Sequence, residues 1–377
     1  MLKKSVNRFR LIFIALLLSF VFSSATSYVA QAFPLSRNDL CLTVEAMGRE
    51  YKFYYPEIDY FKGVAYLKNA QEIVDGIYHD TAVYPEDARV YFFPDLEYPF
   101  KFEGESYGRE IDREDLLAKI ENALRGEGVK VYAKEVIVKP QLTVESLRKS
   151  TYRRAFFSTN FAYSSQERKH NIKLCAEYIG GVMLKQGEEF SFNNVVGERS
   201  EERGFQSARV IENGRFTEGV GGGVCQVSST VYNAALLSGL KITERHAHSM
   251  AVSYVEPSFD AMVSMGYADL RFVNNTDSVI FIVAKIIGEN ICLSVYGEEN
   301  CFTYSRVSEI IEKIPPPDYL RKYSEGLLKG EEKIVVYPKD GLISKGYLEI
   351  YKGGKMIDKK LLSQDKYKPI QGEILYG

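Results

Sequence analysis

Tryptophan is absent from the 377 residues, and histidine and cysteine are scarce, with four and five copies. None of the cysteines belongs to a C-x-x-C pair, which argues against a structural zinc site. The formal net charge is only −2 and no long basic run occurs, so we expect no surface for nucleic acid. The 27 tyrosines and 22 phenylalanines that are present favour β-rich packing.

Five cysteines cannot all pair within one chain, so at least one thiol should stay free. Cys175 lies in a helical pattern of apolar residues and Cys292 in an apolar strand pattern, which predicts that both are buried. A disulfide between Cys292 and Cys301, or one that includes Cys41, remains open. Cys225 differs from the other cysteines because glycines precede it.

Residues 1–34 have the pattern of a targeting segment. Four basic residues precede an apolar run over residues 11–22, and Ala30-Gln31-Ala32 follows as an A-x-A cleavage site. This order is typical of a secretory signal peptide. An uncleaved membrane anchor over residues 11–32 remains open, because that length just suffices to span a bilayer. Both alternatives place the remaining chain outside the membrane, since the basic flank would stay in the cytoplasm.

The patterns predict a multidomain α+β protein. Its first globular part, residues 35–150, mixes strands at 52–55, 90–93 and 129–138 with a helix at 112–124. The acidic first turn of that helix suits the helix dipole. No reactive centre is evident in this part of the sequence, so we interpret it as a spacer or a binding module.

The central domain, residues 151–300, should contain a mostly antiparallel sheet and two main helices. One helix begins with a Ser-Ser-Gln-Glu capping box at residues 164–167 and should extend to about Lys185. The other should begin at Cys225 and end before Gly239, a C-terminal stop signal. Strands are expected at residues 190–192, 252–254, 262–265, 270–272, 279–287 and 291–296.

The C-terminal part, residues 301–377, is predicted to be a linker and a small β-rich module. The run Ile-Pro-Pro-Pro at residues 314–317 indicates a boundary or a stiff linker. Glycine turns separate the strands expected at residues 333–337, 346–351 and 356–362. A structural or adhesive role fits this module better than a catalytic one.

A glycine-rich run leads directly into Cys225. Residues 221–230 have the sequence Gly-Gly-Gly-Val-Cys-Gln-Val-Ser-Ser-Thr. Glycines permit a tight turn and leave room for a substrate. The helix that follows presents unpaired N–H groups and a positive dipole end. A thiol at such a position has a lowered pKa and is prepared for nucleophilic attack, so the sequence predicts a reactive cysteine.

Two of the four histidines, His246 and His248, follow about 20 residues later. In an extended segment Glu244 would point to the same side as both of them, because side chains alternate. One imidazole could take the thiol proton, with His248 slightly favoured. The other imidazole, Glu244, Asp260 or Asp269 could orient it, as in a thiol protease triad.

Two other interpretations of these residues stay open. Cys225 could simply be small and buried, with the two histidines a metal pair or a surface strand. Alternatively Cys225, His246 and His248 could bind zinc and leave an open fourth position. The favoured interpretation is a Cys–His nucleophilic site that needs no metal and no cofactor.

The motifs resemble those of the VanW-like family. The similarity is carried by residues 221–235 and 244–249, and it covers roughly residues 157–297. Residues 35–150 are more weakly similar to the peptidoglycan-binding domain that often precedes this family's core, and the tail loosely resembles a G5-type module. Position 250 is Met and 258–259 is Ser-Phe, where the family tends to carry a proline and a glycine. Further matching segments lie at residues 190–193, 196–199, 260–261 and 269–276.

The resemblance implies a function in the cell wall, outside a bacterial membrane. Domains of the VanW type look like a class of cysteine-dependent L,D-transpeptidases. By that analogy Cys225 would attack the carbonyl after the L-centre of a stem tetrapeptide, release the terminal D-residue and form a thioester. An amine of a neighbouring stem would resolve the thioester, and backbone N–H groups near Cys225 would form the oxyanion hole. The implied substrate-binding residues are Gly222, Gly223, Gln226, Ser228, Ser229, Tyr232, Arg245 and Arg271.

Two further functions stay open beside transpeptidation: a non-catalytic peptidoglycan-binding or scaffold protein, and a cysteine peptidase of stem peptides. In each case the expected partner is peptidoglycan and the expected place is the extracytoplasmic cell envelope. The membrane would be a partner only through residues 1–34, if they are not cleaved. The family's association with glycopeptide-resistance clusters does not define a reaction.

Overall fold

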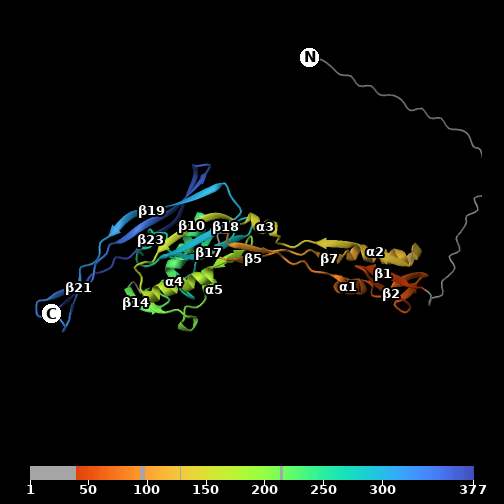
Figure 1. Cartoon of the computed structure of the whole chain (residues 1–377), viewed down its shortest axis with the longest axis horizontal. Coiled ribbons are helices and arrows are strands. Elements are labelled where there is room, and N and C mark those ends of the chain that lie inside the picture. Colours follow the sequence, from red (N-terminus) through yellow and green to blue (C-terminus); the bar gives the residue numbers. More distant parts are fainter. Residues whose placement is uncertain (1–39, 94–97, 128, 213–214) are drawn as a thin grey trace, which may run out of the picture. The chain divides into compact units, whose positions relative to one another are not determined.

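The structure, a computed structural model, describes residues 40–93, 98–127, 129–212 and 215–377. It contains two compact units, which are described separately (Figure 1). The predicted leader, residues 1–34, lies outside the described residues. Within the described ranges, no helix combines the length and the apolar character that crossing a bilayer requires. The first unit takes residues up to 81 and 111–135, and the second takes 82–110 and 136–377.

The first unit is a small α+β fold. A three-stranded sheet of order β2-β1-β8 pairs β1 antiparallel with β2 and parallel with β8. Alternate residues of β1 are buried, so one face of the sheet packs on the helices. The elements of this unit are β1 (Leu42–Ala46), β2 (Arg49–Phe53), β3 (Ile58–Phe61), β4 (Val64–Leu67), α1 (Ala70–Thr81), α2 (Arg113–Asn122), η1 (Ala123–Glu127) and β8 (Lys130–Tyr132).

The predicted helix at 112–124 is α2, which begins after the N-cap Asp112 and is followed by the π-turn η1. The single strand predicted over residues 129–138 is wrong in one respect. The chain there forms β8 and then β9 (Glu135–Val138), and β9 pairs with β7 (Gly108–Ile111). Alternation of apolar residues continues across the break, so periodicity alone could not locate it.

The second unit is organised around a four-stranded antiparallel sheet of order β10-β18-β17-β11, drawn at the centre of Figure 1. One face, including Ile282 and Val295, packs into the main core under the helices. The other face, including Phe281, packs against the hairpin β5-β6. The bounds are β5 (Arg89–Phe92), β6 (Phe100–Glu103), β10 (Tyr152–Asn160), β11 (Val182–Leu184), β17 (Ile280–Ile287) and β18 (Asn290–Gly297).

Two helices, α4 (Gln166–Ile179) and α6 (Val224–Leu237), pack against each other, and α6 also packs on β10 and β18. The predicted span of α6 is confirmed. The prediction that α4 extends to Lys185 is wrong, because Gly180 and Gly181 end the helix and the chain turns into β11. Shorter helices are α3 (Val144–Lys149), α5 (Phe192–Val196) and the 3₁₀ turn η2 (Glu201–Arg203).

A second sheet of order β12-β16-β15 and the hairpin β13-β14 complete the central region. The strands predicted at 252–254 and 262–265 are wrong: these residues form a loop with one isolated bridge, Ser264 to Ala268. This loop carries side chains into the site instead of pairing in a sheet. The bounds are β12 (Glu189–Ser191), β13 (Ser207–Glu212), β14 (Arg215–Val220), β15 (Lys241–Glu244) and β16 (Arg271–Val273).

The C-terminal region is β-rich, as predicted, with the sheets β19-β22-β23 and β20-β24-β21. The proline run at 315–317 follows β19, which pairs along β22, so the run joins two sheets of the same region. Leu348 of this region lies in the main core, and Tyr367 is buried. The bounds are β19 (Phe302–Ile314), β20 (Leu320–Tyr323), β21 (Glu332–Val336), β22 (Gly341–Lys352), β23 (Lys355–Tyr367) and β24 (Glu373–Tyr376).

Candidate active site

Cys225 lies in the first turn of α6 and lines an open cleft of about 1910 Å³. Gly221 and Gly223 have φ values of +87° and +107°, which side chains with a Cβ rarely adopt. A Cβ on Gly222 would lie 2.8 Å from the Cβ of Ala208, so that position also requires glycine. The glycine run therefore brings Cys225, which is half-buried, to the wall of the cleft.

His248 is the histidine that reaches Cys225. Its imidazole lowers the pKa of the thiol, and its Nδ1 lies 2.7 Å from Oδ2 of Asp260, which leaves Nε2 for the sulfur. The backbone N–H of His248 donates to the same carboxylate oxygen at 2.7 Å. The thiol sulfur also lies 3.6 Å from the carbonyl oxygen of Val263. The arrangement is a thiol–imidazole–carboxylate chain at the edge of a cleft.

Electrostatics in this chain favour a charged pair. Burial raises the pKa of the Cys225 thiol, but the hydrogen bond and charge of His248 outweigh it and lower the pKa. Burial lowers the pKa of His248, yet hydrogen bonds to Asp260 and Cys225 raise it to about 9. Burial likewise raises the pKa of Asp260, and His248 and Arg245 together bring it to about 2. These shifts favour the charged pair of thiolate and imidazolium over the neutral pair, beside an Asp260 carboxylate that is ionised at neutral pH.

Asp260 is held in place by two residues that the sequence did not connect with it. The Arg245 guanidinium donates to Oδ1 of Asp260 at 2.9 Å and to both carboxylate oxygens of Asp365 at 2.8 Å. The Tyr367 hydroxyl donates to Oδ1 of Asp260 at 2.6 Å. Asp365 and Tyr367 belong to β23, so the C-terminal region contributes directly to the support of the catalytic candidates.

His246 lies elsewhere. Its Nε2 is 3.0 Å from Glu244, which also pairs with Arg271 at 3.2 Å. Asp269, the other candidate for orienting a histidine, accepts from the hydroxyl of Ser191 at 2.6 Å and pairs with Arg271 at 3.1 Å. The structure thus brings together Cys225, His248 and Asp260, and it places His246, Glu244 and Asp269 in a separate network.

The predicted substrate-binding residues divide into two groups. Gly222, Gly223 and Gln226 line the cleft. Ser228, Ser229 and Tyr232 are buried and do not. The Ser229 hydroxyl donates to the carbonyl of Cys225 at 2.7 Å and accepts from the N–H of Ala261 at 2.9 Å, so it holds the loop of Asp260 against α6. Ser229 therefore joins two structural elements and does not face a substrate.

The two arginines expected to bind a carboxylate of the substrate are already paired within the chain, Arg245 with Asp260 and Arg271 with Glu189. Residues that the sequence analysis missed line the cleft in their place. Of these residues, only Arg199 could have been found from the sequence, because it lies in the segment 196–199 that matches the family. These missed residues are Arg168, Arg199, Arg209, Tyr254, Lys339, Lys366 and Lys368.

The remaining cysteines are free, so neither disulfide alternative is realised. Cys175 and Cys292 are buried, as predicted, and burial raises the pKa of both thiols. No group of three His, Cys, Asp or Glu side chains in the described ranges could hold a metal ion. The zinc alternative fails on geometry, because His246 faces Glu244 and not Cys225.

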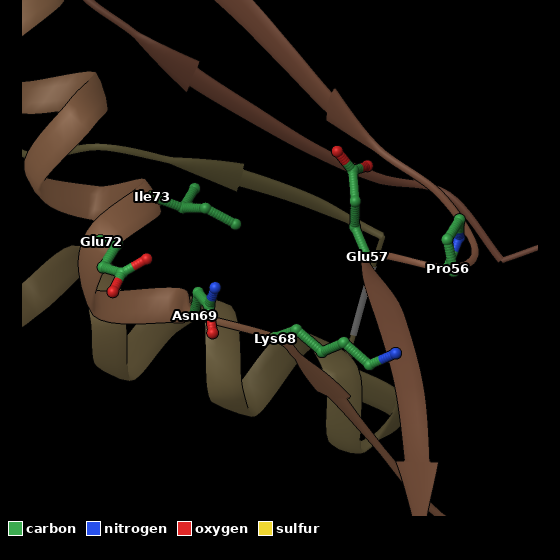
Figure 2. Close-up of a pocket in the computed structure, with 6 residues that line it drawn as sticks. All are labelled: Pro56, Glu57, Lys68, Asn69, Glu72 and Ile73. Atoms are coloured by element: carbon green, nitrogen blue, oxygen red, sulfur yellow. The ribbon is translucent and has the colours of Figure 1, made fainter.

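The first unit has a smaller pocket of about 460 Å³ (Figure 2). Figure 2 shows Glu72 and Ile73 on α1, and Pro56 and Glu57 on the segment before β3 across from them. Its lining includes two glutamates and one lysine. The complete lining is Pro56, Glu57, Lys68, Asn69, Glu72 and Ile73.

Three family models match the chain in succession. A peptidoglycan binding domain matches residues 57–132, the VanW-like protein family matches residues 167–296, and the G5 domain matches residues 306–377. Cys225, His248 and Asp260 all lie within the VanW match, and Asp365 and Tyr367 lie within the G5 match. The match of the G5 domain begins inside β19, ahead of the proline run.

Two curated relatives are similar to part of this chain. The Bacillus subtilis protein described as "Uncharacterized protein YoaR" is 38% identical over 194 residues, which cover 51% of this chain and 64% of that protein. The Enterococcus faecalis "Vancomycin B-type resistance protein VanW" is 31% identical over 149 residues, 38% of this chain and 54% of that protein. The matches thus span only 54–64% of the length of these relatives.

Among solved structures, the "IgA1 Protease G5 domain structure" is 16% identical and covers 22% of this chain and 96% of that chain, with a TM-score of 0.15. Residues 167–296 are similar to the VanW-like family, with a match to a peptidoglycan binding domain before them and a match to the G5 domain after them.

Proposed function

We propose that the cleft at Cys225 carries out acyl transfer on peptidoglycan stem peptides, as a cysteine-dependent L,D-transpeptidase. The observation that carries the proposal is the chain of Cys225, His248 and Asp260 at the wall of an open cleft. A buried structural cysteine would not need a hydrogen-bonded imidazolium beside it, whereas an attacking thiolate does.

In the first half of the reaction the Cys225 thiolate attacks the carbonyl carbon after the L-centre of the donor stem. The C–S bond forms, and the C–N bond to the terminal D-residue breaks while His248 gives its proton to the leaving amine. Asp260 keeps the ring of His248 oriented throughout. A thioester and a free D-amino acid result.

In the second half the amine of an acceptor stem attacks the thioester. His248, now neutral, takes the proton of that amine, the new C–N bond forms and the Cys225 thiolate leaves. The cross-linked peptide is released and the charged pair is restored. At 1910 Å³ the cleft exceeds the roughly 300–1,000 Å³ that suffices for one small ligand, which supports room for two stems.

The amides at the start of α6 are candidates for the oxyanion hole. The N–H groups of Val224 and Gln226 already donate to the carbonyls of Gly221 and Gly223, at 3.1 and 3.0 Å. The Cys225 amide is therefore the better candidate among these three. The positive end of the helix dipole would add to its effect on a developing oxyanion.

The proposed place of action is the extracytoplasmic cell envelope, with peptidoglycan as the partner. The matches to a peptidoglycan binding domain, the VanW family and the G5 domain support this proposal. A relative whose name refers to vancomycin resistance also supports it, because vancomycin resistance concerns the cell wall.

The test is incubation of the purified protein with a disaccharide tetrapeptide, followed by mass spectrometry. We expect a cross-linked dimer and a free D-amino acid from the native protein and from Cys301→Ala, a control that removes an exposed cysteine outside the cleft. Cys225→Ala should form neither product. Equal product from Cys225→Ala would refute the thiol mechanism, and tripeptide without dimer would identify a hydrolase.

A further inference from the structure

Two arginines flank Cys225 in the cleft without a carboxylate to neutralise them. Arg168 comes from the first turn of α4 and Arg199 from the segment after α5, and both line the cleft. Within the described ranges neither lies within ion-pair distance of an Asp or Glu, and burial lowers the pKa of both guanidiniums. The Cys225 thiol acts electrostatically on both guanidiniums, and Asp269 acts on Arg199 from beyond ion-pair distance, but no carboxylate contacts either cation. A half-buried cation without a contacting carboxylate is costly, so a carboxylate of a ligand would stabilise both.

Arg168 is held in a fixed orientation. Its Nη1 donates to the hydroxyl of Ser164 at 2.7 Å and to Oε1 of Gln226 at 2.8 Å. The amide of Gln226 is fixed in turn, because its Nε2 donates to Thr159 and to the carbonyl of Asn160. Only Nη1 of Arg168 is used in this way within the described part of the chain, so Nε and Nη2 remain for a ligand.

Arg199 shows the same feature more strongly. Its Nη2 donates to Oδ1 of Asn193 at 2.7 Å, and its guanidinium lies over the ring of Phe192, 5.6 Å from the centroid. Its Nη1 is buried and has no hydrogen-bond partner. An unsatisfied N–H of a buried cation costs more than an unsatisfied neutral group, which again points to a missing anionic acceptor.

The glycine run explains how both arginines approach the cysteine. A Cβ on Gly221 would lie 3.0 Å from the Cβ of Arg199, and a Cβ on Gly223 would lie 3.1 Å from the Cγ of Arg168. The two arginine stems therefore pack against the turn that precedes Cys225, one on each glycine. The charge of each guanidinium acts on the Cys225 thiol.

The charged residues in the rest of the cleft lining are also mostly cationic. Among its lining residues Glu198 is the only carboxylate. Lys366 and Lys368 are exposed and make no ion pair in the described ranges, and the ammonium of Lys339 donates to the carbonyl of Ala251. Such a cleft favours an anionic ligand. The cationic lining consists of Arg168, Arg199, Arg209, Lys339, Lys366 and Lys368.

We propose that Arg168 and Arg199 together bind the terminal carboxylate of the residue that leaves when Cys225 attacks. This inference rests on the proposed function, which places the attacked carbonyl at Cys225 and the leaving carboxylate one residue beyond it. Guanidinium groups are suited to this task, because their N–H donors match the two oxygens of a carboxylate. The pair makes the cleft specific for a donor stem that ends one residue after the cleaved bond.

The test measures binding to Cys225→Ala, in which no reaction can consume the peptide. Calorimetric titration compares the stem tetrapeptide with the same peptide amidated at its C-terminus. We expect the amide to bind about 10- to 100-fold more weakly, the range expected for losing a charged hydrogen-bonded pair. Adding Arg168→Gln or Arg199→Gln should weaken the acid similarly and abolish the preference for acid over amide.

Arg153→Gln is the matched control, because Arg153 is an exposed arginine of the same unit outside the cleft. It should keep the native affinity and the preference. A tetrapeptide amidated at its other carboxylates should bind like the unmodified peptide, and if it alone loses affinity the assignment to the terminal carboxylate is overturned. Thermal unfolding is measured for each variant and for Arg168→Lys and Arg199→Lys. These measurements identify any variant that fails to fold.

The two proposals fail in different ways. If native protein forms cross-links but the arginine variants keep the preference for acid over amide, the carboxylate site is refuted and the transpeptidase stands. If the preference depends on the arginines but native protein forms no product, the transpeptidase is refuted and the carboxylate site stands. Absence of binding of either peptide to Cys225→Ala overturns the carboxylate site.

Discussion

Two clusters of histidine, carboxylate and arginine start within three residues of each other in the chain and behave differently. In the first, His246 contacts Glu244 at 3.0 Å, and Glu244 contacts Arg271 at 3.2 Å. Their side chains are 42%, 34% and 37% exposed. Water screens charges at such exposure, so this network contributes little beyond its local contacts.

In the second cluster, His248 contacts Asp260 at 2.7 Å and Asp260 contacts Arg245 at 2.9 Å, but the side chains are only 6%, 1% and 8% exposed. The same residue types form a strongly coupled unit here, because little water remains to screen them. The comparison shows that burial and one neighbouring thiol, and not residue identity, distinguish the candidate base His248 from His246.

The largest expected effect comes from replacing the two histidines in turn. His248→Gln should reduce transpeptidation by about 10²–10⁴-fold, since it removes the group that takes and returns the proton. His246→Gln should change the rate by less than about twofold, because its ring lies in the exposed network. The measurement is dimer formation from tetrapeptide, and similar losses in both variants would erase the distinction between the clusters.

The pH dependence tests the charged pair itself. Alkylation of Cys225 by iodoacetamide should begin below the pH typical of a free thiol, because His248 lowers the pKa of the thiol. Transfer should fall as the pH rises through about 9, where His248 loses its proton. Arg199, Asp260 and Tyr254 also face this pair and contribute to its titration.

Asp260→Asn should bring two pH values closer together: the pH at which alkylation of Cys225 begins and the pH at which transfer falls. Without the carboxylate the pKa of His248 falls, so the loss of transfer moves to lower pH, and the thiol pKa rises, so alkylation near neutral pH slows. Glu244→Gln in the exposed cluster is the matched control and should leave both of these pH values unchanged. An unchanged profile for Asp260→Asn would show that the carboxylate does not control the pair.

The smallest expected effect concerns Tyr367, whose hydroxyl contacts Asp260 of the buried cluster. Tyr367→Phe removes the hydroxyl that donates to Asp260 and accepts from the N–H of Ser258. We expect a loss of about 1–2 kcal/mol in the free energy of unfolding and a modest decrease in transfer rate. Denaturant titration and rate measurements on Tyr337→Phe, at an exposed position of the same region, give the reference.

Local signals were sufficient for much of this molecule. The helix after the glycine run, the buried Cys175 and Cys292 and the α+β character followed from periodicity, capping residues and glycine stops. Element ends were less accurate where a glycine pair stopped α4 early. The expected strands at 252–254 and 262–265 failed, because a loop with buried polar anchors has the same apolar content as a strand.

The prediction of a reactive cysteine at the head of a helix came from local sequence, since glycines and helix geometry act over a few neighbouring residues. The fold was needed to show which histidine approaches that cysteine, that Arg168 and Arg199 line the cleft in place of Arg245 and Arg271, and that Tyr367 contacts Asp260. These choices depend on contacts between distant segments and on burial, neither of which is encoded in local spacing.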